Sequence, residues 1–269
     1  MLTPFIAFLL GVLEGLTEYL PVSSTGHLIL AGHLLGLKGE GASSFEIIIQ
    51  LGAVLAVVVH YRRLLLERAA GFLTGKPEAK NLLIALVCAF LPTAVAGLLF
   101  RKIVKAHLFF PLPIALALIV GGLVMIIVER RRRALGIKGL DGLEHVTPKR
   151  ALIIGVGQCF SLWPGSSRSM CTIVAGQFAG LSTATSAEFS FLLALPTLGA
   201  ATLYEGLKAR HVLAASEGPL NLAIGLVVSF FVAWGVIAIF IRYLQRRGLE
   251  PFGYYRIALG VVVLWLLAR

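Results

Sequence analysis

The sequence predicts an all-α polytopic membrane protein, with about six transmembrane helices and two re-entrant helix pairs arranged as an inverted-topology repeat. Of the 269 residues, 58% are hydrophobic and only 14% are charged, and the mean hydropathy is +0.91. Soluble domains carry about 25% charged residues, so the composition indicates a bilayer as the solvent. Apolar runs close to the roughly 20 residues that cross a hydrocarbon core recur along the chain.

The net charge of +11 is explained by membrane topology and not by a nucleic-acid partner. The basic residues lie between the apolar runs and form no stripe with interleaved aromatic residues, which excludes nucleic acid as the expected partner. Five Lys or Arg fall in 61–80, seven in 129–150 and three in 242–253. By the positive-inside rule these three loops are cytoplasmic.

If six apolar segments span the membrane, all three basic loops lie on the cytoplasmic side. The first and the last of them are short. The predicted spans are residues 45–60, 82–100, 111–128, 187–207, 220–241 and 254–268.

Four shorter apolar pieces remain, at 2–13, 26–37, 151–163 and 170–181. Their length, about 12 or 13 residues, suits re-entrant segments better than spans. They form two pairs, and a polar, proline-containing stretch breaks each pair in the middle. The two breaks are LPVSSTGH at 20–27 and WPGSSRSM at 163–170.

The two breaks indicate an internal repeat. Aligning Pro21 with Pro164 superposes the serine pair 23–24 on the serine pair 166–167. Each half then holds one re-entrant pair and three spans, and an odd number of crossings makes the second half enter the membrane from the opposite side. The tips of the breaks are therefore expected to meet near the midplane, where inverted-repeat proteins place substrate sites. We predict a single membrane domain with repeats at about 1–128 and 150–269, joined by a basic cytoplasmic loop, 129–149.

Glu14 and Glu18 are the first candidate site residues. Four positions apart in a helical stretch, they share one helix face with Cβ atoms about 5–6 Å apart. Two carboxylates at membrane depth need a metal ion, a basic side chain or a proton. Mg²⁺ or Ca²⁺ suits such oxygen ligands, with a substrate phosphate completing the shell. A helix-end pair near the outer surface is the alternative.

Arg168 is the only basic residue in the middle of a membrane-depth segment, within PGSSRSMCT at 164–172. Its guanidinium fork matches phosphate oxygens, and Ser167, Ser169 and Thr172 can donate further hydrogen bonds. A helix that begins here adds oriented N–H groups. Anion binding is the expected use, and a purely structural role as counter-ion to a glutamate is the alternative.

The first break repeats this design with three hydroxyls, those of Ser23, Ser24 and Thr25, and one imidazole, that of His27. A histidine can act as base, acid or nucleophile in phosphoryl transfer. A lone histidine beside an apolar run is more often a core residue, so both interpretations stay open.

These motifs resemble those of the bacterial undecaprenyl-diphosphate phosphatase family. EGLTE at 14–18 fits its [EQ]xxxE pattern, and PGSSRSMCT at 164–172 fits its PGxSRSxxT pattern at every fixed position. The stretches EGLTEYLPVSSTGHL and FEIIIQLGAVLAVVV are also similar to that family. The similarity extends over the whole chain.

The resemblance implies an enzyme of the bacterial cytoplasmic (inner) membrane that hydrolyses undecaprenyl diphosphate to undecaprenyl phosphate and inorganic phosphate. This reaction recycles the lipid carrier for peptidoglycan. The resemblance also implies a link to bacitracin resistance. The partners are then a polyprenyl diphosphate and membrane lipids. Glu14 and Glu18 become the metal and catalytic carboxylates. The nucleophile stays open between His27, Ser24 and a water activated by the glutamates.

The resemblance completes the set of candidate site residues, with Arg168 as the clamp on the diphosphate. The candidate catalytic residues are Glu14, Glu18, His27, Arg168 and Ser24. The candidate diphosphate-binding residues are Ser23, Thr25, Ser166, Ser167, Arg168, Ser169 and Thr172.

A membrane transporter or lipid flippase that uses the same midplane site is the rival interpretation, because inverted repeats with broken segments also serve alternating access. Architecture does not fix function, and the motif match favours the phosphatase. A structural scaffold does not explain why the candidate catalytic residues gather at the breaks. The sequence leaves open the metal, the prenyl chain length, the face from which substrate enters and the oligomeric state, a homodimer included.

Overall fold

The computed structural model describes residues 2–37, 40–216 and 218–268, without the side chains of 40–44 and 205–216. Over these residues the fold is helical, and the one isolated β-bridge joins Leu140 to Leu181. The helices are α1 (Pro4–Thr17), α2 (Ser24–Leu34), α3 (Glu40–His60), α4 (Arg62–Leu73), α5 (Pro77–His107), α6 (Pro111–Ala134), η1 (Leu143–His145), α7 (Pro148–Gln158), η2 (Cys159–Leu162), α8 (Arg168–Phe178), α9 (Thr183–Ser216), α10 (Pro219–Arg247) and α11 (Glu250–Leu267).

The long helices confirm the prediction of a polytopic membrane protein. Among the described residues, the five helices α5, α6, α9, α10 and α11 contain stretches long and apolar enough to cross a membrane. The bent pair Phe45–His60 and Arg62–Leu73, whose axes differ by 70°, gives a sixth crossing if the pair acts as one span. Each predicted span falls within one of these elements, except that the span 254–268 extends one residue beyond the end of α11. Helix α4 was not predicted, because its arginines made 61–80 read as a cytoplasmic loop.

The four short apolar pieces form α1, α2, α7 with η2, and α8. The chain reverses between the members of each pair, and the second helix begins at a serine with left-handed backbone, Ser23 (φ 74°) or Ser167 (φ 71°). Each serine caps its helix, because its Oγ accepts the main-chain N–H of the third residue on, at 3.2 Å from Gly26 and 3.3 Å from Met170. A positive φ at a non-glycine residue costs of order 1–3 kcal/mol and persists where the surrounding structure imposes it.

The two caps correspond at Ser23 and Ser167, one residue away from the alignment on the prolines. The second break holds one more residue between its proline, Pro164, and its cap than the first break holds after Pro21. The helix pairs therefore begin alike in geometry but differ by one residue in register. The opposite orientation of the two halves stays a prediction.

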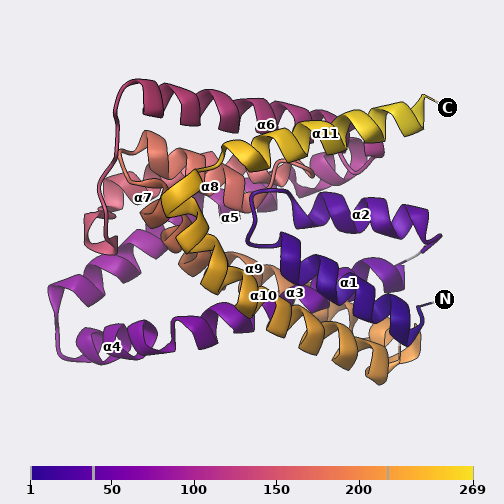
Figure 1. Cartoon of the computed structure of the whole chain (residues 1–269). Coiled ribbons are helices and arrows are strands. Elements are labelled where there is room, and N and C mark those ends of the chain that lie inside the picture. The colour runs from indigo at the N-terminus through magenta and orange to yellow at the C-terminus, as the bar shows by residue number, and fades with distance from the viewer. Residues whose placement is uncertain (1, 38–39, 217, 269) are drawn as a thin grey trace.

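Helices α6 and α11 lie side by side along one edge of the molecule, whereas α1 packs along α10, and α10 along α3 (Figure 1). Close approach of α6 and α11 depends on small residues, as it does in many membrane proteins. A Cβ added to Gly122 would lie 2.6 Å from the carbonyl oxygen of Gly253 and 2.8 Å from Cγ1 of Ile257. The main core includes Tyr19, which directly precedes the first break, and Met170, which ends the second.

Candidate active site

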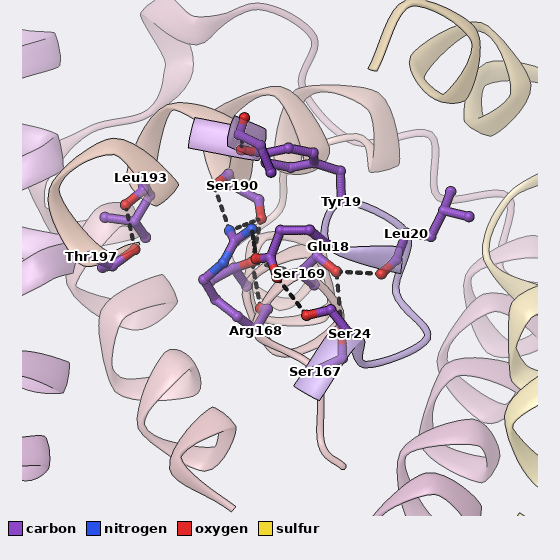
Figure 2. Close-up of polar contacts among 12 residues, drawn as sticks. Glu18, Tyr19, Leu20, Ser24, Ser167, Arg168, Ser169, Ser190, Leu193 and Thr197 are labelled. Atoms are coloured by element: carbon purple, nitrogen blue, oxygen red, sulfur yellow. Dashed lines mark hydrogen bonds and ion pairs between the residues drawn. The ribbon is translucent and has the colours of Figure 1, made fainter. Parts of the chain in front are cut away.

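The structure brings the two breaks into direct contact. Arg168, the first residue of α8, reaches Glu18, the C-cap of α1, with 3.2 Å between Nη2 and Oε1. The side chains are 10% and 5% exposed. A second link is the hydrogen bond that Ser169 Oγ donates to the carbonyl of Leu20, at 2.9 Å. Residues 150 positions apart in sequence thus form one buried group (Figure 2).

Glu18 divides its carboxylate between the two breaks. One oxygen faces Arg168, and the other accepts a hydrogen bond from Ser24 Oγ at 2.5 Å (Figure 2). Ser24 is the first residue of α2, directly after the left-handed Ser23. A carboxylate that accepts a serine O–H has the geometry of a base beside a nucleophile.

Arg168 is also held by two residues that the sequence analysis did not select. Its Nη1 donates to the carbonyl oxygen of Ser190 at 2.9 Å and lies 3.3 Å from Ser190 Oγ. Its Cζ lies 5.8 Å from the centre of the Tyr19 ring, within cation–π range. Its Nε is buried and has no hydrogen-bond partner among the described residues. One strong donor of the guanidinium is therefore left over.

Hydroxyl groups surround the start of α8. Thr172 Oγ1 lies 2.6 Å from Ser190 Oγ, and Ser167 Oγ lies 3.0 Å from Ser169 Oγ. Of the predicted residues, Thr172 and Arg168 contact Ser190 of α9, whereas Ser167 and Ser169 contact each other. A serine inside an apolar span is a sequence signal for Ser190, since polar groups at membrane depth are rare without a role.

Two other predicted residues lie at the breaks without joining these hydroxyl contacts. Ser166 is buried, and its main-chain carbonyl accepts a hydrogen bond from Arg256 at 3.0 Å. Thr25 is half-buried on the first turn of α2. In the described part of the chain its hydroxyl forms no hydrogen bond to Glu18 or Arg168.

Glu14 lies one helical turn before Glu18 and is fully buried. Neither of its carboxylate oxygens has a hydrogen-bond partner among the described residues. An unpartnered buried carboxylate is costly, so a proton or a cation is expected there. The described residues contain no group of three or more His, Cys, Asp or Glu side chains that could hold a metal. The donor chemistry fits a hard cation only if the substrate or water supplies further oxygens.

His27 is engaged on the other side of the first break. Its Nδ1 lies 2.8 Å from the carbonyl oxygen of Ser23, and its Nε2 lies 2.7 Å from the hydroxyl of Tyr255. A carbonyl only accepts, so Nδ1 carries the proton, and Nε2 of the neutral ring accepts the Tyr255 O–H. The hydrogen bonds of His27 therefore go to Ser23 and Tyr255, and not to Glu18 or Arg168.

The fold and the site define a class: a polytopic membrane protein with a buried ionic centre at the junction of two re-entrant breaks. Comparison with known proteins gives the family within this class. The family model described as "Bacitracin resistance protein BacA" matches residues 7–262. The chain belongs to this family.

Curated relatives match the chain over nearly its whole length. A protein of Sorangium cellulosum named undecaprenyl-diphosphatase is 61% identical over 97% of this chain and 86% of its own. A Rhodospirillum rubrum protein named undecaprenyl-diphosphatase 2 is 49% identical over 96% of this chain and 93% of its own. A third, undecaprenyl-diphosphatase of Thermoanaerobacter pseudethanolicus, is 44% identical over 98% of this chain and 96% of its own.

Proposed function

We propose that this protein hydrolyses undecaprenyl diphosphate to undecaprenyl phosphate and inorganic phosphate in the bacterial inner membrane, and so recycles the lipid carrier of cell-wall synthesis. The observation that carries the proposal is the 61% identity, over 97% of the chain, to a protein named undecaprenyl-diphosphatase. The transporter and flippase alternatives receive no support from the relatives, which are named as diphosphatases. The homodimer stays a hypothesis, which light scattering in detergent tests.

Arg168 binds the diphosphate in this proposal. Its Nε is an unused buried donor, and its Nη2 can be shared between Glu18 and a phosphate oxygen. Ser190 and Tyr19 fix the plane of the guanidinium before substrate arrives, which lowers the entropy cost of binding. The N-termini of α2 and α8 begin at the breaks and favour a negative charge there.

Glu18 and Ser24 are the proposed reacting pair. The attacking oxygen, of Ser24 or of a water in its place, gives its proton to Glu18 and bonds to the terminal phosphorus. The bond between that phosphorus and the bridging oxygen breaks, and undecaprenyl phosphate leaves. If Ser24 attacks, a water must then hydrolyse the phosphoserine. The contact between Glu18 and Ser24 favours this pair over His27, whose ring nitrogens are both hydrogen-bonded elsewhere.

Glu14 and Glu18 are the proposed holders of a divalent cation, Mg²⁺ or Ca²⁺. Bound there, the cation would neutralise charge on the phosphate oxygens. The two unpartnered oxygens of Glu14 support this assignment. Its position four residues before Glu18 places both carboxylates on the side of α1 that meets the breaks.

Phosphate release from undecaprenyl diphosphate by the detergent-purified chain tests the proposal, with undecaprenyl phosphate as the comparison substrate. We expect release from the diphosphate only, loss of release after a chelator is added, and recovery with Mg²⁺ or Ca²⁺. Folded wild-type protein that releases no phosphate with any divalent cation would contradict the proposed function. Full activity in the chelator would contradict only the cation.

A further inference from the structure

Among the described residues, Arg256 of α11 has the largest fully buried side chain, with an exposed fraction of 0%. Burial of a charged group costs several kcal/mol unless partners replace the water. Among the described residues no carboxylate forms an ion pair with Arg256. Its partners are instead main-chain carbonyl groups.

All five N–H donors of the Arg256 guanidinium meet a carbonyl oxygen. Nε donates to Leu118 at 3.3 Å, Nη1 to Pro21 at 3.1 Å and Ser166 at 3.0 Å, and Nη2 to Ala117 at 3.0 Å and Gly165 at 2.8 Å. The first break, the second break and α6 each contribute at least one of these carbonyls. A single side chain therefore joins both breaks to the α6–α11 pair.

We infer that Arg256 is a positioning residue for the phosphatase site, an inference that rests on the proposed function. Pro21 lies three residues after Glu18 and three before Ser24, so its carbonyl holds the chain that joins the proposed base to the proposed nucleophile. The carbonyls of Gly165 and Ser166 lie directly before the cap of α8 and Arg168. Arg256 thus holds the backbone of both breaks, whose side chains must meet to form the site.

The same contacts orient a main-chain N–H group of the second break, that of Ser167. The Ser166 carbonyl points at Arg256, and in a trans peptide the N–H of the next residue, Ser167, points the opposite way. Among the described residues this N–H has no acceptor. Arg256 therefore holds a main-chain donor at the start of α8 directed away from itself, as an anion at a helix N-terminus requires.

The pocket of Arg256 is matched to a guanidinium. A Cβ added to Gly121 of α6 would lie 2.8 Å from Arg256 Cζ, so only glycine leaves this room. Lysine keeps the charge but has three donors in place of five and no planar fork. Arg256→Lys should therefore keep the fold and loosen both breaks.

Arg132 offers a matched control. Its guanidinium likewise donates to main-chain carbonyls, those of Gln177 at 2.8 Å and Leu181 at 3.0 Å, at the far end of α8. For full-length protein in detergent, we expect Arg256→Lys to lower kcat on the order of 10²-fold, as displacements of about 1 Å do. The KM should change less than about threefold, since Arg168 still binds the diphosphate. Arg132→Lys should keep the kcat of the wild type.

Amide hydrogen exchange supplies a readout that is independent of turnover. In Arg256→Lys, exchange should quicken at residues 20–27 and 163–170, whereas Arg132→Lys should leave both segments unchanged. Gly121→Ala, which keeps Arg256 but pushes on its guanidinium, should reproduce the loss of kcat. If Arg256→Lys does not fold, the kcat of Gly121→Ala tests the positioning role of Arg256 in its place.

Wild-type kcat and wild-type exchange at both breaks in folded Arg256→Lys would overturn the inference. A rise in KM at unchanged kcat would overturn it too, because Arg256 would then serve binding alone. If the wild-type chain released no phosphate, the proposed function would fail instead, and the exchange of 20–27 and 163–170 would still show whether Arg256 holds the breaks.

Discussion

At the scale of single residues, Glu18 is the group that joins the two breaks. One oxygen neutralises Arg168, and the other accepts the hydroxyl proton of Ser24. In the proposed mechanism a phosphate oxygen shares the Arg168 guanidinium with Glu18. Substrate binding and the proposed base are thus linked through one guanidinium.

Ser24→Ala should lower kcat by about 10²-fold or more, because general-base activation of a positioned hydroxyl contributes at least this much. The measurement is steady-state phosphate release by protein of confirmed folding. Ser186→Ala is the matched control, since Ser186 Oγ is also buried and donates at 2.7 Å to the carbonyl of Ser182, away from the breaks. Activity of Ser24→Ala within about threefold of wild type would assign the attack to water.

Sequence reasoning selected the polar residues of the breaks but missed those that hold them. Glu18, Ser24 and Arg168 stand out because charge and hydroxyl clusters are rare at membrane depth. Sequence reasoning gave Tyr19 no role in the site, and Arg256 follows a basic loop, where an arginine is ordinarily a topology signal. Their partners are main-chain carbonyls or a ring from distant segments, and no local pattern encodes such contacts.

At the scale of elements, two short helices and one helix pair position the site. Helices α2 and α8 begin at left-handed serines, which turn the chain at the breaks and direct both helix N-termini there. The α6–α11 pair lies behind them and presents Arg256 to the break carbonyls. The glycines at the contact between α6 and α11 leave the room that the buried Arg256 side chain occupies.

Gly122→Ala should lower the stability of the protein by about 1–3 kcal/mol, because the added methyl group overlaps the Gly253 carbonyl. Thermal unfolding in detergent measures this change. Gly235→Ala in α10 is the control, since nothing lies within 4 Å of a Cβ at that position. It should keep or raise the melting temperature, and an equal loss in both variants would argue against close packing of α6 on α11.

Helix α4 shows where element prediction failed. Three arginines, Arg62, Arg63 and Arg68, made the segment read as a loop by charge count. The structure instead bends the chain by 70° after His60 and continues as a helix with Leu66 70% exposed. Basic residues combined with apolar residues are typical of a helix that lies at the membrane surface, and a count of charges alone does not distinguish such a helix from a loop.

At the scale of the whole molecule, the site exists only where the two halves meet. The first half supplies Glu18 and Ser24, and the second supplies Arg168 and Ser190. The spans were predictable because bilayer thickness fixes the length of apolar runs. The opposite orientation of the halves stays a prediction that rests on the basic loops, since charge counts and not packing determine it.

The most direct test of this account compares two Arg–Glu pairs in one phosphate-release assay. The pair across the breaks is changed by Glu18→Gln and Arg168→Lys. The control pair, Arg130 and Glu250 with 2.8 Å between Nε and Oε1, lies outside the breaks and is changed by Glu250→Gln and Arg130→Lys.

We expect each change in the break pair to lower kcat/KM for undecaprenyl diphosphate on the order of 10²-fold or more, because each removes charge or fork geometry at the transferred phosphate. The control changes should stay within about threefold of wild type. Near-normal turnover by folded Arg168→Lys and Glu18→Gln would contradict a phosphatase site at the junction of the two breaks.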